Sequence, residues 1–523
     1  MNIQTRPGSV IVETASGTLR GATENGIHRF KGVPYGASTA GARRFLPPAP
    51  PAAWSGVRDA LEYGPRAPQQ EGAVRPANAW IRDGRPTSED CLVLNVFTPG
   101  LKDNGKRPIM VYLHGGGYER GAGSAPGLDG ANLARTGDLV VVTLNHRLGA
   151  FGFTHLAGTD ARFADAGNAG MLDIVAALRW VRDHADTFGG DAGNVTIFGQ
   201  SGGGSKVAVC MAMPEAKGLF HKAIMQSSSS HLRLATAENA ARAAGRLLAQ
   251  LGLDKPQAAK LQDVPADKLL AAYRAAVAAA NGNDSFRPVV DGRSVPHHPF
   301  DPAAPDLSAG IPLLIGSCET EKSFYDITAD PKTLPLDAAQ LVKEVARFVG
   351  IDRAKAEDVI AGYRETRPAA SGRDLFNVIA SDHQYRRNAI EAAERKARQG
   401  GAPAYLYELT WKTPVLGGML KTPHTLCLPF VFGNTAIAKD FTGTGPAQEA
   451  LTRAVMGAWI AFARSGNPNH AGLPAWTPYQ AKTRPTMIFD DDCRLALDPK
   501  PEDRVRINTC PPFVSDMQWP MPR

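Results

Sequence analysis

The sequence lacks long apolar stretches and a leader-like start. No stretch approaches about 18 consecutive apolar residues, the length that a membrane-spanning helix needs. The opening residues, MNIQTRPGSVIVETASGTLRG, contain neither the charged region nor the apolar region of a secretory signal peptide. We therefore expect a cytoplasmic protein without a membrane span, unless a leader peptide has been removed.

Cysteine is also scarce. The chain has six cysteines, spread singly through 523 residues, and no CxxC pair occurs among them. This spacing argues against a zinc site and against a compact disulfide framework, so we expect reduced thiols. The six positions are Cys91, Cys210, Cys318, Cys427, Cys493 and Cys510.

Concentrated charge of one sign is missing as well. The formal net charge is +7 and the pI is near 9.0, but Lys and Arg are interleaved with Asp and Glu, without a run of five or six. A solvated basic surface therefore fits better than a nucleic-acid interface. With 43% hydrophobic and 21% charged residues, the composition is that of a globular protein with a large core, which excludes disordered and fibrous classes.

Apolar runs predict the strands of a parallel sheet. Residues 91–97, 108–113 and 138–144 are nearly continuous in apolar residues, and such runs are typical of strands covered on both faces. An apolar stripe with helical spacing over 170–188 directly precedes another strand at 194–198. Strand, helix and strand in succession predict a doubly wound α/β sheet.

Further elements surround this sheet. The proline-rich segment 44–56 can be neither helix nor central strand, so we expect it to wrap the surface, anchored by Trp54. Residues 337–398 are mainly helical in pattern. The other expected elements are an antiparallel hairpin at 9–32, strands at 221–226, 311–316 and 404–409, and helices at 236–252, 265–280 and 447–464.

The strand at 194–198 runs into Gly199-Gln200-Ser201-Gly202-Gly203, the pattern G-x-S-x-G. Its glycines permit a turn that no bulkier residue could make. In a nucleophile elbow, such a strained strand-to-helix turn exposes the serine Oγ, and the helix N-terminus beneath it favours negative charge. Alone, the pattern fits a glycine-rich turn that happens to contain serine equally well.

Three other segments are placed to meet Ser201. HGGGY at 114–118 follows a strand, and its glycines let backbone N–H groups approach a substrate oxygen, as in an oxyanion hole. Glu319 and Glu321 follow another strand, where a carboxylate can fix the tautomer of a histidine. His424 lies in a loop between apolar and glycine neighbours. The order nucleophile, acid, base along the chain is the one used by serine hydrolases with this elbow.

Over nearly its whole length the chain resembles the type-B carboxylesterases, the family of cholinesterases, mammalian carboxylesterases and bacterial para-nitrobenzyl esterases. The likeness lies in specific motifs that occur in family order. They are RFLPP with WSGV (54–57), SEDCLVLNVFTP (88–99), HGGGY (114–118), NHRLGAFGF (145–153), the block at 167–204, IMQSS (224–228), GSCETEKSF (316–324) and HTLCLPFVFG (424–433).

The resemblance implies an α/β-hydrolase fold, with a large, mostly parallel central sheet flanked by helices and with loop and helical insertions around the active-site entrance. It implies one domain over residues 1–523, with a mainly helical insertion at about 330–400. Aligned on Gly316, the acidic residue of the family falls on Glu321 rather than Glu319. The implied catalytic residues are Ser201, Glu321 and His424, and the implied oxyanion-hole donors are Gly116, Gly117 and Gly202.

Several positions depart from the family pattern. Gln200 stands where Glu is common, which removes a negative charge near the acyl centre, and Gly202 stands where Ala is common. Secreted members close a disulfide to the position of Cys91, but its partner cysteine is missing near Ala67, so we expect Cys91 to be a free, buried thiol. Cys427 stands where the family often carries Glu.

The implied activity is hydrolysis of carboxylic esters through an acyl-enzyme, which requires neither a metal nor an organic cofactor. The expected partner is a small-molecule ester, with no nucleic acid and no membrane, and the chain is expected to be a monomer or a weak homo-oligomer. One alternative is an amide or carbamate hydrolase with the same triad. Another is a non-catalytic adhesion or carrier module, which the filled triad positions disfavour.

The pocket is less well defined by the sequence. From family position, we expect residues 69–82 near the mouth of the pocket and residues 228–234 and 417–420 in its lining. Trp80 and Phe324 fit a pocket lining and an ordinary core equally well.

Overall fold

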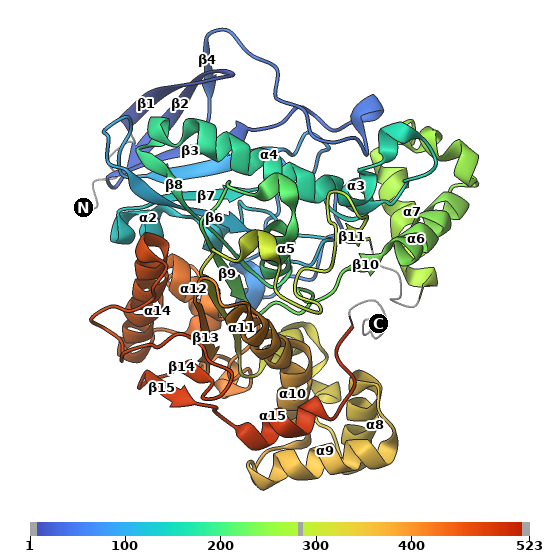
Figure 1. The fold of residues 1–523 in the computed structure, drawn as a ribbon, viewed down its shortest axis with the longest axis vertical. Coiled ribbons are helices and arrows are strands. Elements are labelled where there is room, and N and C mark those ends of the chain that lie inside the picture. Colours follow the sequence, from blue (N-terminus) through green and yellow to red (C-terminus); the bar gives the residue numbers. More distant parts are fainter. Residues whose placement is uncertain (1–7, 281–285, 515–523) are drawn as a thin grey trace.

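The computed structural model describes residues 8–280 and 286–514, and Figure 1 shows their arrangement. The first seven residues, on which part of the leader-peptide expectation rests, lie outside the described residues. Within the described ranges, no helix combines the length and the apolar character needed to cross a membrane.

Thirteen strands form one sheet, in the order β1-β2-β3-β5-β7-β6-β8-β9-β12-β13-β14-β15, with β4 paired to β2. Two short strands, β10 and β11, pair separately. The bounds are β1 Gly8–Thr14, β2 Gly17–Glu24, β3 Ile27–Pro34, β4 Val57–Asp59, β5 Val93–Thr98, β6 Arg107–Leu113, β7 Val140–Leu144, β8 Gly190–Gln200, β9 Lys222–Gln226, β10 Ala235–Thr236, β11 Val289–Val290, β12 Leu313–Cys318, β13 Ala404–Leu409, β14 Pro485–Phe489 and β15 Arg494–Leu497.

The centre of the sheet is parallel, and its edges are antiparallel. Strands β7, β6, β8, β9, β12, β13 and β14 run parallel to one another, whereas β1, β2, β3 and β5 form an antiparallel edge beside β7, and β15 pairs antiparallel with β14 at the other edge. The expectation that β5 is parallel is therefore wrong. Its continuous apolar run reflects burial of every residue from Val93 to Thr98, and burial on both faces does not set strand direction.

Helices cover both faces of the sheet. Along β6, Ile109, Val111 and Leu113 pack into one core together with residues of α4, α5 and α11, while Met110 and Tyr112 pack into a second core with α2, α12 and α14. The helix bounds are α1 Pro76–Ala79, α2 Ala131–Gly137, α3 Gly149–Phe153, α4 Ala169–His184, α5 Gly202–Ala212, α6 Ala237–Gln250, α7 Ala266–Ala279, α8 Ala338–Val349, α9 Arg353–Glu365, α10 Gly372–Ser381, α11 Arg387–Gln399, α12 Cys427–Phe432, α13 Lys439–Thr442, α14 Pro446–Ser465 and α15 Pro501–Asn508.

A third core lies apart from the sheet. It joins α8, α9 and α10 with Ile507 and Cys510 from the C-terminal part of the chain, and none of its residues belongs to the two cores of the sheet. In Figure 1, α8 and α9 project at the end of the molecule opposite β1 and β2. The segment 337–398, predicted to be mainly helical, is helical except for short connections.

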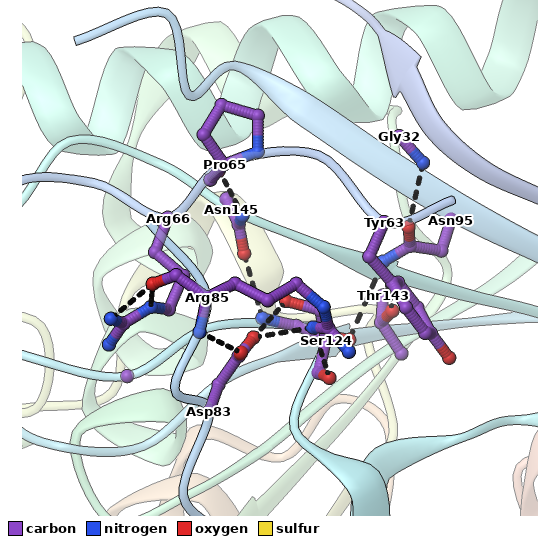
Figure 2. A network of polar contacts seen from close by, with 12 residues as sticks. Gly32, Tyr63, Pro65, Arg66, Asp83, Arg85, Asn95, Ser124, Thr143 and Asn145 are labelled. Carbon is purple, nitrogen blue, oxygen red and sulfur yellow. Dashed lines mark hydrogen bonds and ion pairs between the residues drawn. The ribbon is translucent and has the colours of Figure 1, made fainter. Parts of the chain in front are cut away.

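A network of polar side chains fixes the loops around β6 and β7 (Figure 2). Asn145, directly after β7, accepts the Gly123 N–H through its side-chain oxygen at 2.8 Å. Ser124 Oγ donates to Asp83 at 2.5 Å, and Asn95 Nδ2 donates to Thr143 Oγ1 at 2.9 Å. These bonds satisfy buried polar groups, and they anchor the chain that leaves the loop after β6.

A buried ion pair joins the loop after β7 to α4. Arg147 contacts both carboxylate oxygens of Asp173, at 2.8 and 2.6 Å, and the two side chains are at most 1% exposed. Replacing Asp173 with Asn leaves the guanidinium charge buried without a counter-charge, which typically costs several kcal/mol. We expect Asp173→Asn to lower the free energy of unfolding by about 3 kcal/mol in urea titrations followed by tryptophan fluorescence.

Glu238→Gln is the matched control, because it breaks the exposed helical pair between Glu238 and Arg242. Its effect should stay below about 0.5 kcal/mol. Equal shifts for the two variants would contradict a structural role for the buried pair.

Candidate active site

Ser201 occupies a strained turn between β8 and α5. Its backbone has φ 60° and ψ −127°, and its N–H donates to the carbonyl of Gln226 at 2.8 Å. The flanking glycines are required by packing: a Cβ at Gly203 would lie 1.9 Å from the Leu113 oxygen, and one at Gly199 would lie 2.4 Å from the Gly203 carbonyl carbon. Strain of this kind is often found at functional sites, where the surrounding structure enforces it.

The glycine loop after β6 packs on the start of α5. Gly116 and Gly117 adopt φ values of 89° and 63°, which disfavour any residue with a side chain. A Cβ at Gly202 would lie 2.3 Å from the Gly117 oxygen, so the loop and the helix touch through backbone alone. In the described part of the chain, the N–H groups of Gly116, Gly117 and Gly202 donate to no protein acceptor. Three free backbone donors therefore lie beside Ser201.

Glu321 and His424 form a buried pair. Glu321, which begins the short helix after β12, places Oε2 2.5 Å from His424 Nδ1, and its other oxygen accepts the Cys318 N–H at 2.7 Å. Glu321 is fully buried and His424 is 3% exposed. Because a carboxylate only accepts, Nδ1 carries the proton, and Nε2 of a neutral His424 is left with a lone pair. Glu319, the neighbouring carboxylate, instead pairs with Lys500 at 2.8 Å.

The Gln200 side chain lies against the imidazole of His424. Its amide nitrogen is 3.1 Å from Nε2 and 3.3 Å from Nδ1. One atom cannot lie along both in-plane directions of these nitrogens, so we interpret the contact as an amide packed on the ring face. In the described residues Ser201 Oγ and His424 form no hydrogen bond, a separation that is common before substrate binds.

Aromatic side chains surround His424 on its other sides. The Tyr325 ring stacks at 6.4 Å and 19°, the Tyr385 ring lies at 5.1 Å, and Phe324 approaches edge-on at 6.2 Å. The hydroxyls of Tyr325 and Tyr385 are 3.4 Å apart, and Tyr325 is 42% exposed whereas Tyr385 is buried. Desolvation raises the pKa of both phenols, so both stay neutral. On these sides the imidazole therefore contacts uncharged aromatic rings, which we call the aromatic wall.

Cys427, at the position where Glu is common in the family, is a buried thiol. Gln226 donates to its sulfur at 3.1 Å, and Trp459 donates in turn to the Gln226 oxygen at 3.3 Å. Burial, and then a contact with Cys427, raises the pKa of the neighbouring Cys318 thiol. This chain thus has an amide, Gln200, and a cysteine, Cys427, at the two positions where the resemblance led us to expect Glu. Cys91 is free and buried, as expected.

The residues expected near the pocket differ in their surroundings. Trp80 is 3% exposed and stacks on Phe441 at 5.4 Å, so it is a core aromatic, whereas Phe324 is partly buried and contacts both Phe441 and His424. Gln69 is held by the Gly121 N–H at 2.7 Å, which ties the segment 69–82 to the end of the glycine loop.

Some residues of this region escape sequence reasoning. Tyr385 lies on a π-helical turn (Asp382–Arg386), far along the chain from every motif, and nothing in its sequence context indicates the contact with His424. Lys206 could have been found from the sequence, because it is the one charged residue in the otherwise apolar and small-residue α5 sequence GGGSKVAVCMA. Within the described residues, no group of three or more His, Cys, Asp or Glu side chains is arranged to hold a metal ion.

Comparison with known proteins shows which family this chain belongs to. The model of the carboxylesterase family matches residues 8–504. The para-nitrobenzyl esterase of Bacillus subtilis (strain 168) is 37% identical over 502 residues, which cover 95% of this chain and 98% of the relative. The phenmedipham hydrolase of Pseudarthrobacter oxydans is 33% identical, with 97% and 99% covered.

Solved structures agree with the sequence comparison. The Geobacillus stearothermophilus carboxylesterase EST55 at pH 6.2 superimposes with a TM-score of 0.82 at 38% identity, covering 95% of this chain and 99% of the other. Its likeness extends over the parallel sheet and the flanking helices, which form the α/β-hydrolase fold expected from the sequence. The chain belongs to the carboxylesterase family and is a hydrolase of carboxylic esters.

Proposed function

We propose that Ser201, His424 and Glu321 are the nucleophile, base and acid of this esterase. The contact between Glu321 and His424 Nδ1 at 2.5 Å is the observation that carries the proposal. It fixes the tautomer whose Nε2 can accept a proton, and it places a buried negative charge where an imidazolium would form. Ser201 lies on the adjoining strained turn, next to Gln200, which touches the same ring.

The N–H groups of Gly116, Gly117 and Gly202 are proposed to form the oxyanion hole. Their support is that all three lack a protein acceptor among the residues that the structure describes, and that Gly117 packs directly on Gly202. Such preorganised donors stabilise the charge that develops on the carbonyl oxygen, and one donor is worth on the order of 3 kcal/mol in the barrier.

In the proposed cycle, His424 takes the Ser201 proton as Oγ bonds to the ester carbonyl carbon. The tetrahedral intermediate collapses, the carbon–oxygen bond to the alcohol breaks, and His424 gives its proton to the departing alkoxide. Water, deprotonated by His424, then attacks the acyl-enzyme. The bond between the acyl carbon and Ser201 Oγ then breaks, Oγ regains a proton from His424, and the carboxylic acid is released.

The aromatic wall around His424 bears on the substrate. Because His424 protonates the leaving group, the alcohol half of the ester should lie near Phe324, Tyr325 and Tyr385. These side chains favour an apolar or aromatic alcohol, and the name of the Bacillus subtilis relative, para-nitrobenzyl esterase, fits that choice.

Ser201→Ala should reduce hydrolysis of 4-nitrophenyl acetate by at least about 10⁴-fold, because the bond-forming atom is removed. A phosphonate serine reagent followed by peptide mass mapping should modify Ser201 in the wild type. Ser205→Ala is the matched control, since Ser205 lies on the same helix and bonds only to Ser228 Oγ at 2.8 Å among side chains. Turnover by Ser201→Ala at the wild-type rate would refute the assignment.

Gln200→Glu should move the acid limb of the kcat/KM profile to higher pH by about one unit. A carboxylate packed on the ring would stabilise the imidazolium, and the base works only when it is neutral, so activity would be lost at a higher pH on acidification. Rates from pH 5 to 9 test this, with Gln200→Met as the uncharged control. An acid limb that is the same in all three proteins would contradict the contact described for Gln200.

A further inference from the structure

A lysine is buried beneath the glycine loop. Lys206 lies on α5, five residues after Ser201, and its side chain is fully buried. The rest of α5 is glycine, serine, cysteine and apolar residues, so this charge is an exception in its helix. A buried ammonium is costly for the fold unless it is paired, and such exceptions call for a physical reason.

The ammonium holds the glycine loop at both ends. Nζ donates to the carbonyl oxygen of His114 at 2.9 Å, and it lies 5.7 Å from the centre of the Tyr118 ring. His114 and Tyr118 are the first and last residues of HGGGY, and the proposed oxyanion donors Gly116 and Gly117 lie between them. The Lys206 side chain, which comes from the helix that follows Ser201, therefore contacts both ends of the loop.

Among the described residues, no carboxylate pairs with this lysine. In the described part of the chain Lys206 forms no ion pair, and burial lowers its pKa to about 7. The titratable groups that face it are His114, His146 and Tyr118. The rings of His114 and His146 stack at 4.9 Å, and burial, together with the charge of Lys206, lowers the pKa of both, so both imidazoles are neutral.

Other hydrogen bonds of the loop do not reach its glycine N–H groups. In the described residues the N–H groups of Gly116 and Gly117 donate to no protein acceptor, whereas the Gly116 carbonyl accepts the N–H groups of Glu119 and Arg120, at 3.3 and 3.1 Å, and the Gly115 oxygen lies 2.8 Å from His114 Nδ1. Beyond the loop, the N–H groups of Gly121 and Gly123 donate to the side-chain oxygens of Gln69 and Asn145. On the side nearest Ser201, the Lys206 ammonium supplies the corresponding tie.

We propose that Lys206 is a positioning residue of this esterase: by holding His114 and Tyr118, it sets the N–H groups of Gly116 and Gly117 relative to Ser201. The inference rests on the proposed oxyanion hole. Lys206 does not touch the substrate, and its effect should appear where the oxyanion forms. An apolar residue would serve the packing of α5, so we assign the amino group to its hydrogen bond with the loop.

Lys206→Met tests the proposal, because it keeps an unbranched side chain up to the ε position and removes the amino group. With 4-nitrophenyl acetate, we expect kcat per titrated active site to fall by about 10- to 100-fold, less than for direct loss of hole donors, while KM changes less than about threefold. Affinity for a trifluoromethyl ketone, which forms an oxyanion on Ser201, should fall by a similar factor.

Lys396→Met is the matched control. Lys396 is another buried lysine, and it bonds to backbone carbonyls of Ser308 and Ala309 at 2.9 and 2.7 Å, outside the glycine loop. Its replacement should lower stability and leave kcat per active site within about twofold. Wild-type kcat and ketone affinity in Lys206→Met would overturn the proposal. If Ser201→Ala were inactive at the same time, the proposed triad would still stand, so the two failures are distinguishable.

A stability measurement keeps the test informative if turnover is difficult to interpret. The pKa of Lys206 is about 7 in the fold against 10.5 when unperturbed, so between these values the unfolded chain binds more protons and wild-type stability rises with pH. Lys206→Met lacks this gain. We therefore expect Tm of the variant minus Tm of the wild type to be most positive at pH 6.5 and to shrink by a few degrees at pH 9.

If Tm of the variant minus Tm of the wild type instead grew with pH, the folded protein would stabilise the ammonium form of Lys206. That result would overturn the view that burial of this charge destabilises the fold. Lys206→Leu gives a second apolar variant for both measurements if Lys206→Met does not fold.

Discussion

The close approach of three backbone segments is the constraint on which the site depends. The end of β6, the end of β8 and the first turn of α5 meet so tightly that a single methyl group at Gly203 would collide with the Leu113 carbonyl. This contact forces the chain to reverse at Ser201 with a positive φ, and the same contact brings the glycine loop against Gly202. The nucleophile position and the free N–H groups are therefore consequences of one packing arrangement, and neither could be shifted without the other.

Much of the fold could be predicted because its signals are local. Apolar runs at β6 and β7, the helical stripe of α4 and the glycines around Ser201 each determine a short piece of structure, and these predictions are confirmed. Local signals fail where direction or length is set by distant partners. The buried strand β5 is antiparallel because β3 and β7 pair with it, and the short helix α12 after His424 is stabilised by packing in the core with α2 and α14.

The site shows the same division. The sequence motifs indicated Ser201, Glu321, His424 and the three glycines, and the structure brings Glu321 to His424 and the glycine loop to Ser201; the roles of these residues stay predictions. Contacts between residues far apart in the chain could not be read from one sequence. The placement of Gln200 on the imidazole, of Tyr385 beside it and of Lys206 under the loop depends on how the elements pack. Glu319 and Glu321 lie two residues apart, but they face different partners: Glu319 pairs with Lys500, and Glu321 accepts the Cys318 N–H beside His424.

The separate core of α8, α9 and α10 has an evolutionary consequence. Its apolar residues are shared with neither core of the sheet, yet it reaches the wall around His424, since Ser381 at the end of α10 accepts the Lys322 N–H at 3.1 Å and the π turn with Tyr385 follows directly. Substitutions within this core should therefore leave the packing around the turn at Ser201 unchanged. This helical unit can therefore change in sequence, and shift the side chains around His424, without altering the packing of the sheet that holds Ser201.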